Sequence, residues 1–302
     1  MWLHGELYDI AAGWRPVGGS ATFGEYSKHF DAAVAAPNGD LVALMASTLT
    51  KGLLLEPPGV PIREVNRSYV EADAYRYPLT LFTLPDGRTG LVHCPEYRNQ
   101  LEIEVAATGE RLTDGDRAPD DFFHSRLAVS PSGRYLLSAG WVWSPYSCLA
   151  VYDLHRALVT PATLDRWTSD DVCDGREFLD AEVSGACFVG DDVVLSTAEP
   201  ATLVRWSLAA RTAVWTRELD RCAGDLVPLH GNVLAVHEHP VLYDAATGER
   251  LAEWPDLPTG ESRSAIVYDR TFSGPNRIAV DPTTPRFAHT DGATVTVVHL
   301  GR

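Results

Sequence analysis

The amino-acid sequence predicts an all-β fold built from repeated units of about four strands each. Short apolar runs recur along the chain with the two-residue alternation of a strand. Turn-forming Pro, Asn, Asp and Gly residues separate these runs, and no stretch of twelve or more residues carries a helical apolar stripe. A chain of 302 residues can hold two domains or one large all-β domain. The repeats favour a single all-β domain.

The clearest repeat runs from Ser125 to Gly140 and continues at Leu149–Leu154. Leu127 and Val129 alternate with smaller or polar neighbours, which is the period of a strand. The Pro131–Gly133 segment predicts a hairpin turn, because Pro presets φ and Gly supplies a positive φ. Glycines hold the same place in two other copies, at Gly39 and Gly87.

The spacing of the repeats predicts a β-propeller. First-strand signals occur at intervals of about 40 to 60 residues, the usual size of a four-stranded blade. They lie near Ala32–Ala36, Leu79–Leu84, Arg126–Ser130, Gly185–Val189, Asp225–Leu229 and Arg277–Val280. Hairpins of a third and a fourth strand recur at Val105–Arg111 and Val241–Arg250, and Leu203–Leu208 is a third strand of the same kind.

We therefore expect one propeller domain over residues 1–302, with six blades favoured and seven as the alternative. A seventh blade would have to lie in 155–182 or 255–275, where the repeat signal is poor. The expected blades are approximately 30–66, 69–113, 122–166, 178–219, 225–256 and 264–300, the last together with 1–18.

The N-terminal segment is expected to close the ring. The last copy supplies only about three strands, and an open ring would leave an unpaired edge that invites aggregation. Glu6–Ile10 and Trp14–Val17 resemble a displaced hairpin of a third and a fourth strand. We therefore predict that an N-terminal strand completes the C-terminal blade.

The repeats resemble those of WD40-type β-propellers over nearly the whole chain. The resemblance rests on Val151-Tyr152-Asp153, on Tyr243-Asp244 followed by Thr247-Gly248-Glu249-Arg250, and on His124-Ser125 ahead of Ser130–Gly133. The Trp-Asp pair of that family is replaced by Tyr-Asp, and most copies lack the Gly-His pair. Such a resemblance implies a fold more firmly than a function, because one fold hosts many functions.

The charge of the chain excludes a general nucleic-acid binder. Lys and Arg total 25 and Asp and Glu total 41, so the net charge of this acidic protein is −16. A protein that binds nucleic acid needs a dense basic surface, and anionic lipid would repel this chain. We therefore expect neither nucleic acid nor membrane as a partner.

Composition and cysteine usage indicate a cytoplasmic, bacterial protein. The sequence opens without the basic and apolar regions of a secretory signal, and no apolar run approaches a membrane span. The five cysteines form no C-x-x-C pair, which favours reduced thiols. Only two lysines and many alanines are typical of a GC-rich bacterial genome.

Aromatic residues in two neighbouring repeats predict an exposed binding patch. Trp and Tyr are the usual anchors of protein interfaces, and apolar loops on a rigid scaffold often mark a binding surface. The alternative is that the tryptophans fold inward and cover the core between blades. The candidate partner-binding residues are Tyr75, Tyr77, Tyr97, Trp141, Trp143 and Tyr146.

Three histidines end second strands at matching positions, at His93, His237 and His289. Imidazoles beside a carboxylate suit metal binding or general-base catalysis. No metal-specific spacing supports such a site, so a structural or surface role is favoured and no metal is expected. His239 lies two residues beyond His237, which would place both on one strand face.

Two acidic segments complete the candidates. Glu71, Asp73 and Tyr75 would share one face of a strand and could do acid–base work if a pocket desolvated them, although a wet rim is favoured. The segment Ser169–Glu177, continuing to Asp180 and Glu182, fails the spacing of a calcium loop, so we expect a solvated insertion.

Two functions remain open. The favoured one is a non-catalytic propeller platform that binds a protein or peptide partner through its rim. The alternative is an enzyme, a lyase, isomerase or hydrolase, that acts on a small molecule at the mouth of the central channel. No phosphate-binding loop, dinucleotide fingerprint, zinc-protease helix or serine-hydrolase elbow is present, so no cofactor is expected. A deep pocket with buried histidines beside carboxylates would favour the enzyme, and a flat aromatic face would favour the platform.

Overall fold

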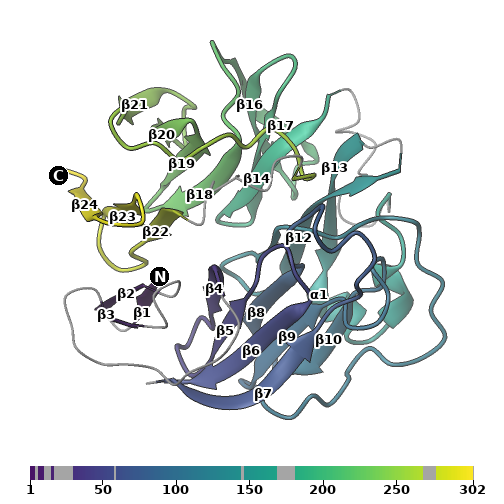
Figure 1. Ribbon diagram of the computed structural model, residues 1–302. Coiled ribbons are helices and arrows are strands. Elements are labelled where there is room, and N and C mark those ends of the chain that lie inside the picture. Colours follow the sequence, from purple (N-terminus) through teal and green to yellow (C-terminus); the bar gives the residue numbers. More distant parts are fainter. Residues whose placement is uncertain are drawn as a thin grey trace.

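The computed structural model describes residues 1–3, 6–9, 15–16, 30–57, 59–143, 146–168, 181–267 and 277–301. Nearly all regular structure in these residues is β, and the strands form seven antiparallel sheets. Figure 1 shows the sheets following one another around a common centre, the arrangement of a β-propeller.

The sheets follow the order of the chain. The N-terminal sheet holds β1 (Trp2–Leu3), β2 (Glu6–Asp9) and β3 (Arg15–Pro16). The next holds β4 (Ala32–Ala35), β5 (Val42–Met45), β6 (Lys51–Glu56) and β7 (Val60–Asn66). It is followed by β8 (Leu79–Thr83), β9 (Thr89–His93) and β10 (Glu102–Val105).

The fourth sheet holds β11 (Leu127–Val129), β12 (Tyr135–Val142) and β13 (Tyr146–Asp153), and a short α1 (Leu154–Ala157) and the 3₁₀ helix η1 (Pro161–Leu164) follow it. The fifth holds β14 (Val183–Val189), β15 (Asp192–Thr197), β16 (Thr202–Ser207) and β17 (Thr212–Glu218). The sixth holds β18 (Asp225–Leu229), β19 (Asn232–His237), β20 (His239–Asp244) and β21 (Arg250–Glu253). The seventh holds β22 (Ile278–Val280), β23 (Arg286–Thr290) and β24 (Val295–His299).

Each segment expected to hold a first strand contains one, namely β4, β8, β11, β14, β18 and β22. The predicted hairpin turns are also present. Gly133 has a φ of 75°, and its N–H donates to the Ser130 carbonyl at 2.8 Å. Gly39 and Gly87 likewise have positive φ values. The turn chemistry read from the repeats therefore sets the first hairpin of each of these three sheets.

The hydrophobic core lies between neighbouring sheets. One cluster joins Phe82, Val92 and Ile103 of the β8–β10 sheet to Leu136 and Cys148 of the next sheet. Because such a sheet packs against a neighbour on each face, strands such as β5 and β9 are buried along their whole length. The four described cysteines, Cys94, Cys148, Cys187 and Cys222, are buried free thiols within this packing.

The predicted closure of the last blade by an N-terminal strand is not observed. Strands β2 and β3 do pair as the expected hairpin, with Tyr8 opposite Pro16. However, β1 adds to the other edge of β2, and within the described residues these strands form a sheet separate from β22–β24. The two-residue strand β1 was too short to recognise in the sequence.

The N-terminal sheet contacts both of its neighbours through β1. Leu3 packs in one apolar cluster with Val42, Leu44 and Leu53 of the β4–β7 sheet. On the other side, the Trp2 indole N–H donates to the Ala279 carbonyl of β22 at 3.3 Å. This sheet therefore lies between the first four-stranded sheet and the last sheet, where the sequence predicted one added strand.

Among the described residues, no helix has the length and apolar character that crossing a membrane requires. The acidic segment Ser169–Glu177, together with Asp180, lies outside the described residues, as does Cys173.

The contact of β1 with the first four-stranded sheet makes a testable contribution to stability. We expect Leu3→Ala to lower the free energy of unfolding by about 2–4 kcal/mol, because it leaves a cavity in a buried cluster. Leu49 is 59% exposed, so Leu49→Ala serves as the control. This variant should change the free energy of unfolding by about 0.5 kcal/mol or less. Urea unfolding measures both, and equal effects would contradict the packing of β1 against this sheet.

Candidate functional site

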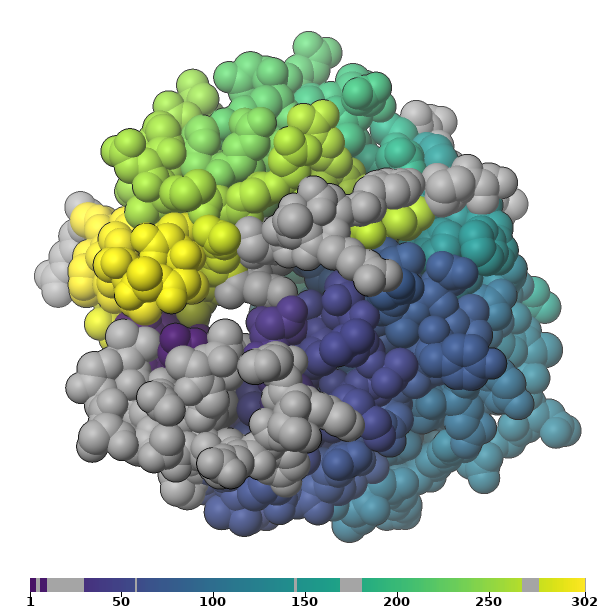
Figure 2. All heavy atoms as spheres, viewed as in Figure 1, coloured from purple at the N-terminus to yellow at the C-terminus, as the bar shows by residue number. Residues whose placement is uncertain are grey.

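The first strands enclose a central cavity of about 500 Å³. Strands β4, β8, β11, β14 and β18 line it, and among the described residues each of them is an edge strand of its sheet. The lining side chains are mostly apolar, among them Val34, Leu79, Leu127, Val129, Phe188 and Val227. A second cavity of about 500 Å³ lies between the N-terminal sheet, β4, β22 and β23, where Figure 2 shows the surface hollowed.

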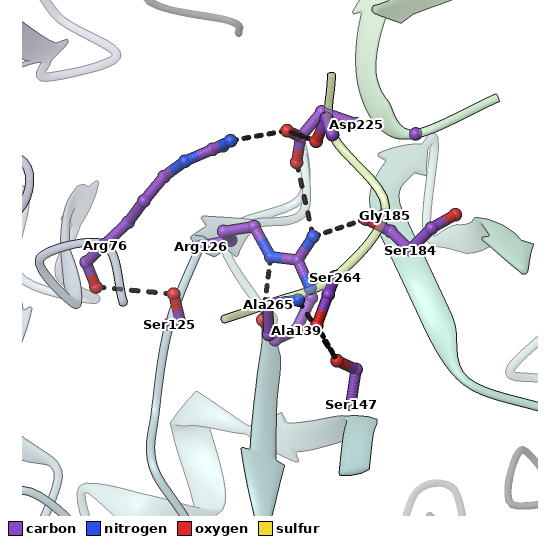
Figure 3. A network of polar contacts seen from close by, with 12 residues as sticks. Arg76, Ser125, Arg126, Ala139, Ser147, Ser184, Gly185, Asp225, Ser264 and Ala265 are labelled. Carbon is purple, nitrogen blue, oxygen red and sulfur yellow. Dashed lines mark hydrogen bonds and ion pairs between the residues drawn. The ribbon is translucent and has the colours of Figure 1, made fainter. Parts of the chain in front are cut away.

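A charged cluster marks one end of the central cavity (Figure 3). The Asp225 carboxylate lies 2.6 Å from Nη2 of Arg76 and 3.3 Å from Nη1 of Arg126. The Ser262 hydroxyl donates a hydrogen bond to the same carboxylate. Two guanidinium groups, one carboxylate and one hydroxyl therefore meet at this point, and we call these four residues the charged cluster.

The cluster is built by residues that precede or open first strands. Arg76 lies shortly before β8, Arg126 lies immediately before β11, and Asp225 opens β18. Arg126 has a φ of 49°, the left-handed region that side chains rarely adopt. Such strained backbone persists only where the surroundings hold it, and it is concentrated at functional sites.

The Arg126 guanidinium is held from three sides. Its Nε donates to the Ala139 carbonyl at 2.9 Å, and its Nη1 donates to the Ser184 carbonyl as well as to Asp225. These acceptors come from strands β12, β14 and β18. The guanidinium therefore ties three sheets together at the cavity.

Burial and ion pairing compete at these groups. Burial opposes ionisation of Asp225, but the charges of Arg76 and Arg126 and the Ser262 hydrogen bond outweigh it and hold the pKa of Asp225 below its usual value. Burial lowers the pKa of Arg126, and the Asp225 charge opposes this shift. An Arg side chain nevertheless keeps its proton in proteins. The cluster therefore stays ionised near neutral pH.

A segment that connects β21 to β22 crosses this end of the first strands, and we call its residues Thr259–Val267 the strap (Figure 1). Gly224 lets the strap approach, because a Cβ at this position would collide with the Ser262 carbonyl. The strap makes hydrogen bonds in chain order: Thr259 to Glu238 at 2.8 Å, Ser262 to His237 at 2.9 Å, Ser264 to Ser147 at 2.7 Å and Val267 to Ala74 at 2.7 Å.

Three of the predicted patch residues are buried rather than exposed. Trp141 is only 2% exposed and stacks on Phe123, with ring centroids 3.9 Å apart. Tyr75 and Tyr77 are also buried, each beneath the Arg67 guanidinium. Trp141 is buried because β12 extends to Val142, so that Trp141 is a strand residue rather than a loop residue. Tyr75 is covered by the strap, where it forms a β-bridge with Ile266.

A glycine allows the close stacking of Phe123 on Trp141. The two residues exchange backbone hydrogen bonds of 2.8 and 3.1 Å. A Cβ at Gly140 would collide with the Phe123 carbonyl, so only glycine permits this approach. Trp141 therefore takes the alternative position considered for the tryptophans, folded inward rather than exposed.

The other patch residues lie at the surface. Trp143 is 53% exposed and stands edge-on to Trp141 and Phe123, with centroid distances of 5.3 and 5.4 Å. Tyr97 is 61% exposed, and the adjacent Arg98 guanidinium lies 4.7 Å from the Phe123 ring centre. Tyr146 is partly buried. We call Tyr97, Arg98, Phe123, Trp141 and Trp143 the aromatic rim.

One exposed ring, that of Tyr69, was not predicted from the sequence. Tyr69 lies after β7 and is largely exposed, and its neighbour Val70 packs on the cluster that contains Phe123 and Trp141. A large aromatic residue just before a turn is the signal that marks it.

The three candidate histidines are not brought together. His93, His237 and His289 are buried in three different sheets. Nε2 of His93 lies 3.1 Å from Oε1 of Glu104. His237 accepts the Ser262 N–H, and burial lowers its pKa. Nε2 of His289 lies 2.8 Å from the Pro258 carbonyl oxygen. His289 also lines the second cavity.

The criterion for an enzyme is thus met only in part. His93 is buried beside a carboxylate, and although burial opposes ionisation of Glu104, His93 and Arg63 lower the pKa of this carboxyl to about 2. None of these three residues is among those that line the central cavity. A histidine–carboxylate pair exists, but away from the cavity.

His237 and His239 do not lie on one strand, because they end β19 and begin β20 and pair across a tight turn at Glu238. Directly opposed residues of an antiparallel pair share one face of the sheet, so the two histidines lie on the same face, as expected. His239 also contacts Arg221 at 2.6 Å. The strand expected for Glu71 and Asp73 is not observed. Glu71 and Asp73 are exposed in a turn rather than aligned with Tyr75 on a strand. The turn is closed by the Ala74 N–H, which donates to the Glu71 carbonyl at 2.9 Å, and Glu71 has a φ of 52°.

No group of three or more His, Cys, Asp or Glu side chains that could hold a metal ion occurs in the part of the chain that the structure describes. Glu182, the described end of the second acidic segment, accepts the Ser147 N–H at 2.9 Å. This residue thus stabilises β13 from the neighbouring sheet.

The charged cluster was not predicted from the sequence either. A charged residue stands shortly before or at the start of several first strands, as at Asp31, Arg76, Arg126, Glu182 and Asp225. Since the starts of β8, β11 and β18 meet at one end of the central cavity, this recurrence is the signal that could have located the cluster.

The fold has counterparts among solved structures. Hydrazine synthase of Kuenenia stuttgartiensis matches with a TM-score of 0.61 and 11% identity, over 95% of this chain and 86% of that chain. BamB from Moraxella catarrhalis matches with a TM-score of 0.46 and 14% identity, over 88% of this chain and 70% of that chain. No protein-family model and no curated protein sequence matches this chain. At 11% identity the first likeness concerns the fold alone, and it supports the β-propeller architecture.

The charged cluster should carry a measurable share of the stability. We expect Asp225→Asn to lower the free energy of unfolding by about 3–5 kcal/mol, because it leaves the buried Arg126 charge uncompensated. Asp192→Asn is the control, since the Asp192–Arg205 pair is more exposed and should contribute about 1 kcal/mol or less.

The sign of the pH dependence follows from the lowered pKa of Asp225. Its contribution is complete above the unfolded pKa of about 4 and is lost as the pH falls through the folded pKa. Urea unfolding at several pH values should therefore show that the difference in free energy of unfolding between wild type and Asp225→Asn becomes smaller as the pH falls below about 5. A difference that becomes larger with acid would contradict an ionised Asp225.

Proposed function

We propose that this protein is a non-catalytic platform that binds a protein or peptide partner through the aromatic rim. The observation that carries the proposal is the position of Trp143, which is half exposed while its ring rests against the buried Phe123–Trp141 stack. Exposed Trp and Tyr rings, with an Arg beside them, are the residue types that dominate binding energy at protein interfaces.

Rigidity of the rim supports the proposal. Phe123 and Trp141 belong to a buried cluster with Tyr75 and with Ala265 of the strap. An aromatic anchor that is already held in place loses little conformational entropy when a partner binds. The rim is therefore prepared for binding before a partner arrives.

The alternative is an enzyme that acts on a small molecule at the channel mouth, and the central cavity is its support. Its candidate groups are dispersed, because His93, His237 and His289 lie in separate sheets. Within the cavity, Asp225 is held ionised between two guanidinium groups, so it is a poor proton donor near neutral pH. We therefore rank the platform first.

We also propose that all seven sheets are blades of one ring, the N-terminal sheet included. The contacts of Leu3 with the β4–β7 sheet and of Trp2 with β22 support this arrangement.

Paired variants test the platform. We expect Trp143→Ala to weaken partner binding by about thirtyfold, the effect of losing about 2 kcal/mol at an interface hot spot. The melting temperature should change little, because the ring is half exposed. Val159→Ala is the control, since Val159 is 83% exposed and lies beyond the opposite end of β13 from Trp143. Affinity capture, followed by titration calorimetry with the captured partner, measures the partner affinity of both variants.

Trp141→Ala separates interface from core. Loss of this buried ring should lower stability by about 3–5 kcal/mol, unlike loss of Trp143. If Trp143→Ala captures the same partner with unchanged affinity, the aromatic rim is not the binding surface.

A further inference from the structure

The central cavity has the dimensions and lining of a small-molecule site. Its volume of about 500 Å³ falls within the range of about 300–1,000 Å³ that ligand pockets occupy. Most lining side chains come from apolar residues of the first strands, and the described charged groups gather at one end. Mostly apolar walls with a few converging polar groups are the general pattern of such pockets.

The charged residues at that end determine which sign of ligand charge the cavity favours. Among the described residues that line the cavity, the charged ones are Arg76, Arg126 and Asp225, two cations and one anion. The two guanidinium groups would repel a ligand cation, whereas they would attract a carboxylate or phosphate. Arg is also the residue that best matches the planar geometry of such anions.

The two guanidinium groups have different roles. Arg126 is 7% exposed and is held by the Ala139 and Ser184 carbonyls and by Asp225. The Arg76 side chain is 16% exposed and reaches Asp225 through Nη2. Arg76 is thus the more exposed of the two guanidinium groups, and it lines the cavity. Arg76 is therefore the group placed to contact a ligand, and Arg126 and Asp225 position it.

We propose that the central cavity binds a small organic anion, whose acidic group contacts the Arg76 guanidinium and whose apolar part lies among the side chains of the first strands. Asp225 fixes the guanidinium in place before the ligand arrives, which reduces the entropic cost of binding. The strap covers the same end through Ser262. Exclusion of water there strengthens the attraction between the ligand anion and Arg76.

Three probes with one apolar chain and different head groups test the proposal: octanoate, 1-octanol and octylammonium. Titration calorimetry with the wild-type chain should show octanoate binding about tenfold or more tightly than octanol, the effect of one charge-assisted contact. Octylammonium should bind more weakly than octanol. This comparison uses the wild type alone, so it does not depend on the folding of any variant.

Variants then locate the site. In Arg76→Gln, octanoate should lose its advantage over octanol, while octanol binding stays unchanged. Arg134→Gln is the control, because Arg134 is an exposed Arg that pairs with Asp153 at the surface, and it should behave as the wild type. Trp143→Ala should also leave octanoate binding unchanged, which separates the cavity from the aromatic rim.

Three results would each overturn the proposal. One is the absence of measurable octanoate binding to the wild type. Another is octylammonium binding as tightly as octanoate. The third is an advantage of octanoate over octanol that survives in folded Arg76→Gln, because the anion would then be held elsewhere.

Discussion

The Asp225 carboxylate joins parts of the chain that are far apart in sequence. Arg76, Arg126 and the strap residue Ser262 all contact it, and through them it connects the starts of β8, β11 and β18. Within the described residues, the first strands β8, β11 and β18 are edge strands of their sheets, so side chains at their starts can join one sheet to another. The hydrophobic core holds pairs of adjacent sheets, whereas the charged cluster acts across several of them. Removal of the Asp225 anion would take away the carboxylate that compensates the buried Arg126 charge.

The repeated turns made the fold accessible from the sequence. Pro131–Gly133 and the matching glycines Gly39 and Gly87 marked hairpins that the structure contains, because a positive φ restricts these positions to few residue types. The N-terminal sheet was not accessible, since β1 spans only Trp2–Leu3 and is stabilised by contacts with other sheets rather than by its own pattern. Tertiary contacts of this kind leave no periodic signal.

The candidate site was accessible only in part. Aromatic residue types predicted a rim, but the burial of Trp141 depends on the length of β12 and on the close approach at Gly140. The strand alternation assumed for Glu71 and Asp73 failed, because these residues lie in a turn. The charged cluster was hidden because its members are single residues separated by long stretches of sequence, and only the packing of the sheets brings them within hydrogen-bond distance. Rim and cavity thus offer two distinct surfaces on one scaffold, with the strap packed against the residues of both.

Hydrogen exchange at the strap amides tests most directly whether the charged cluster fastens this part of the structure. The Ser262 N–H donates to His237, and the Ala265 N–H donates to Ser147, although both amides lie outside any sheet. If Asp225 holds the strap, these amides are protected in the wild type and exchange much faster in Asp225→Asn, while the amides in the middle of β12 keep their protection. Equal protection of the strap amides in both proteins would contradict the account.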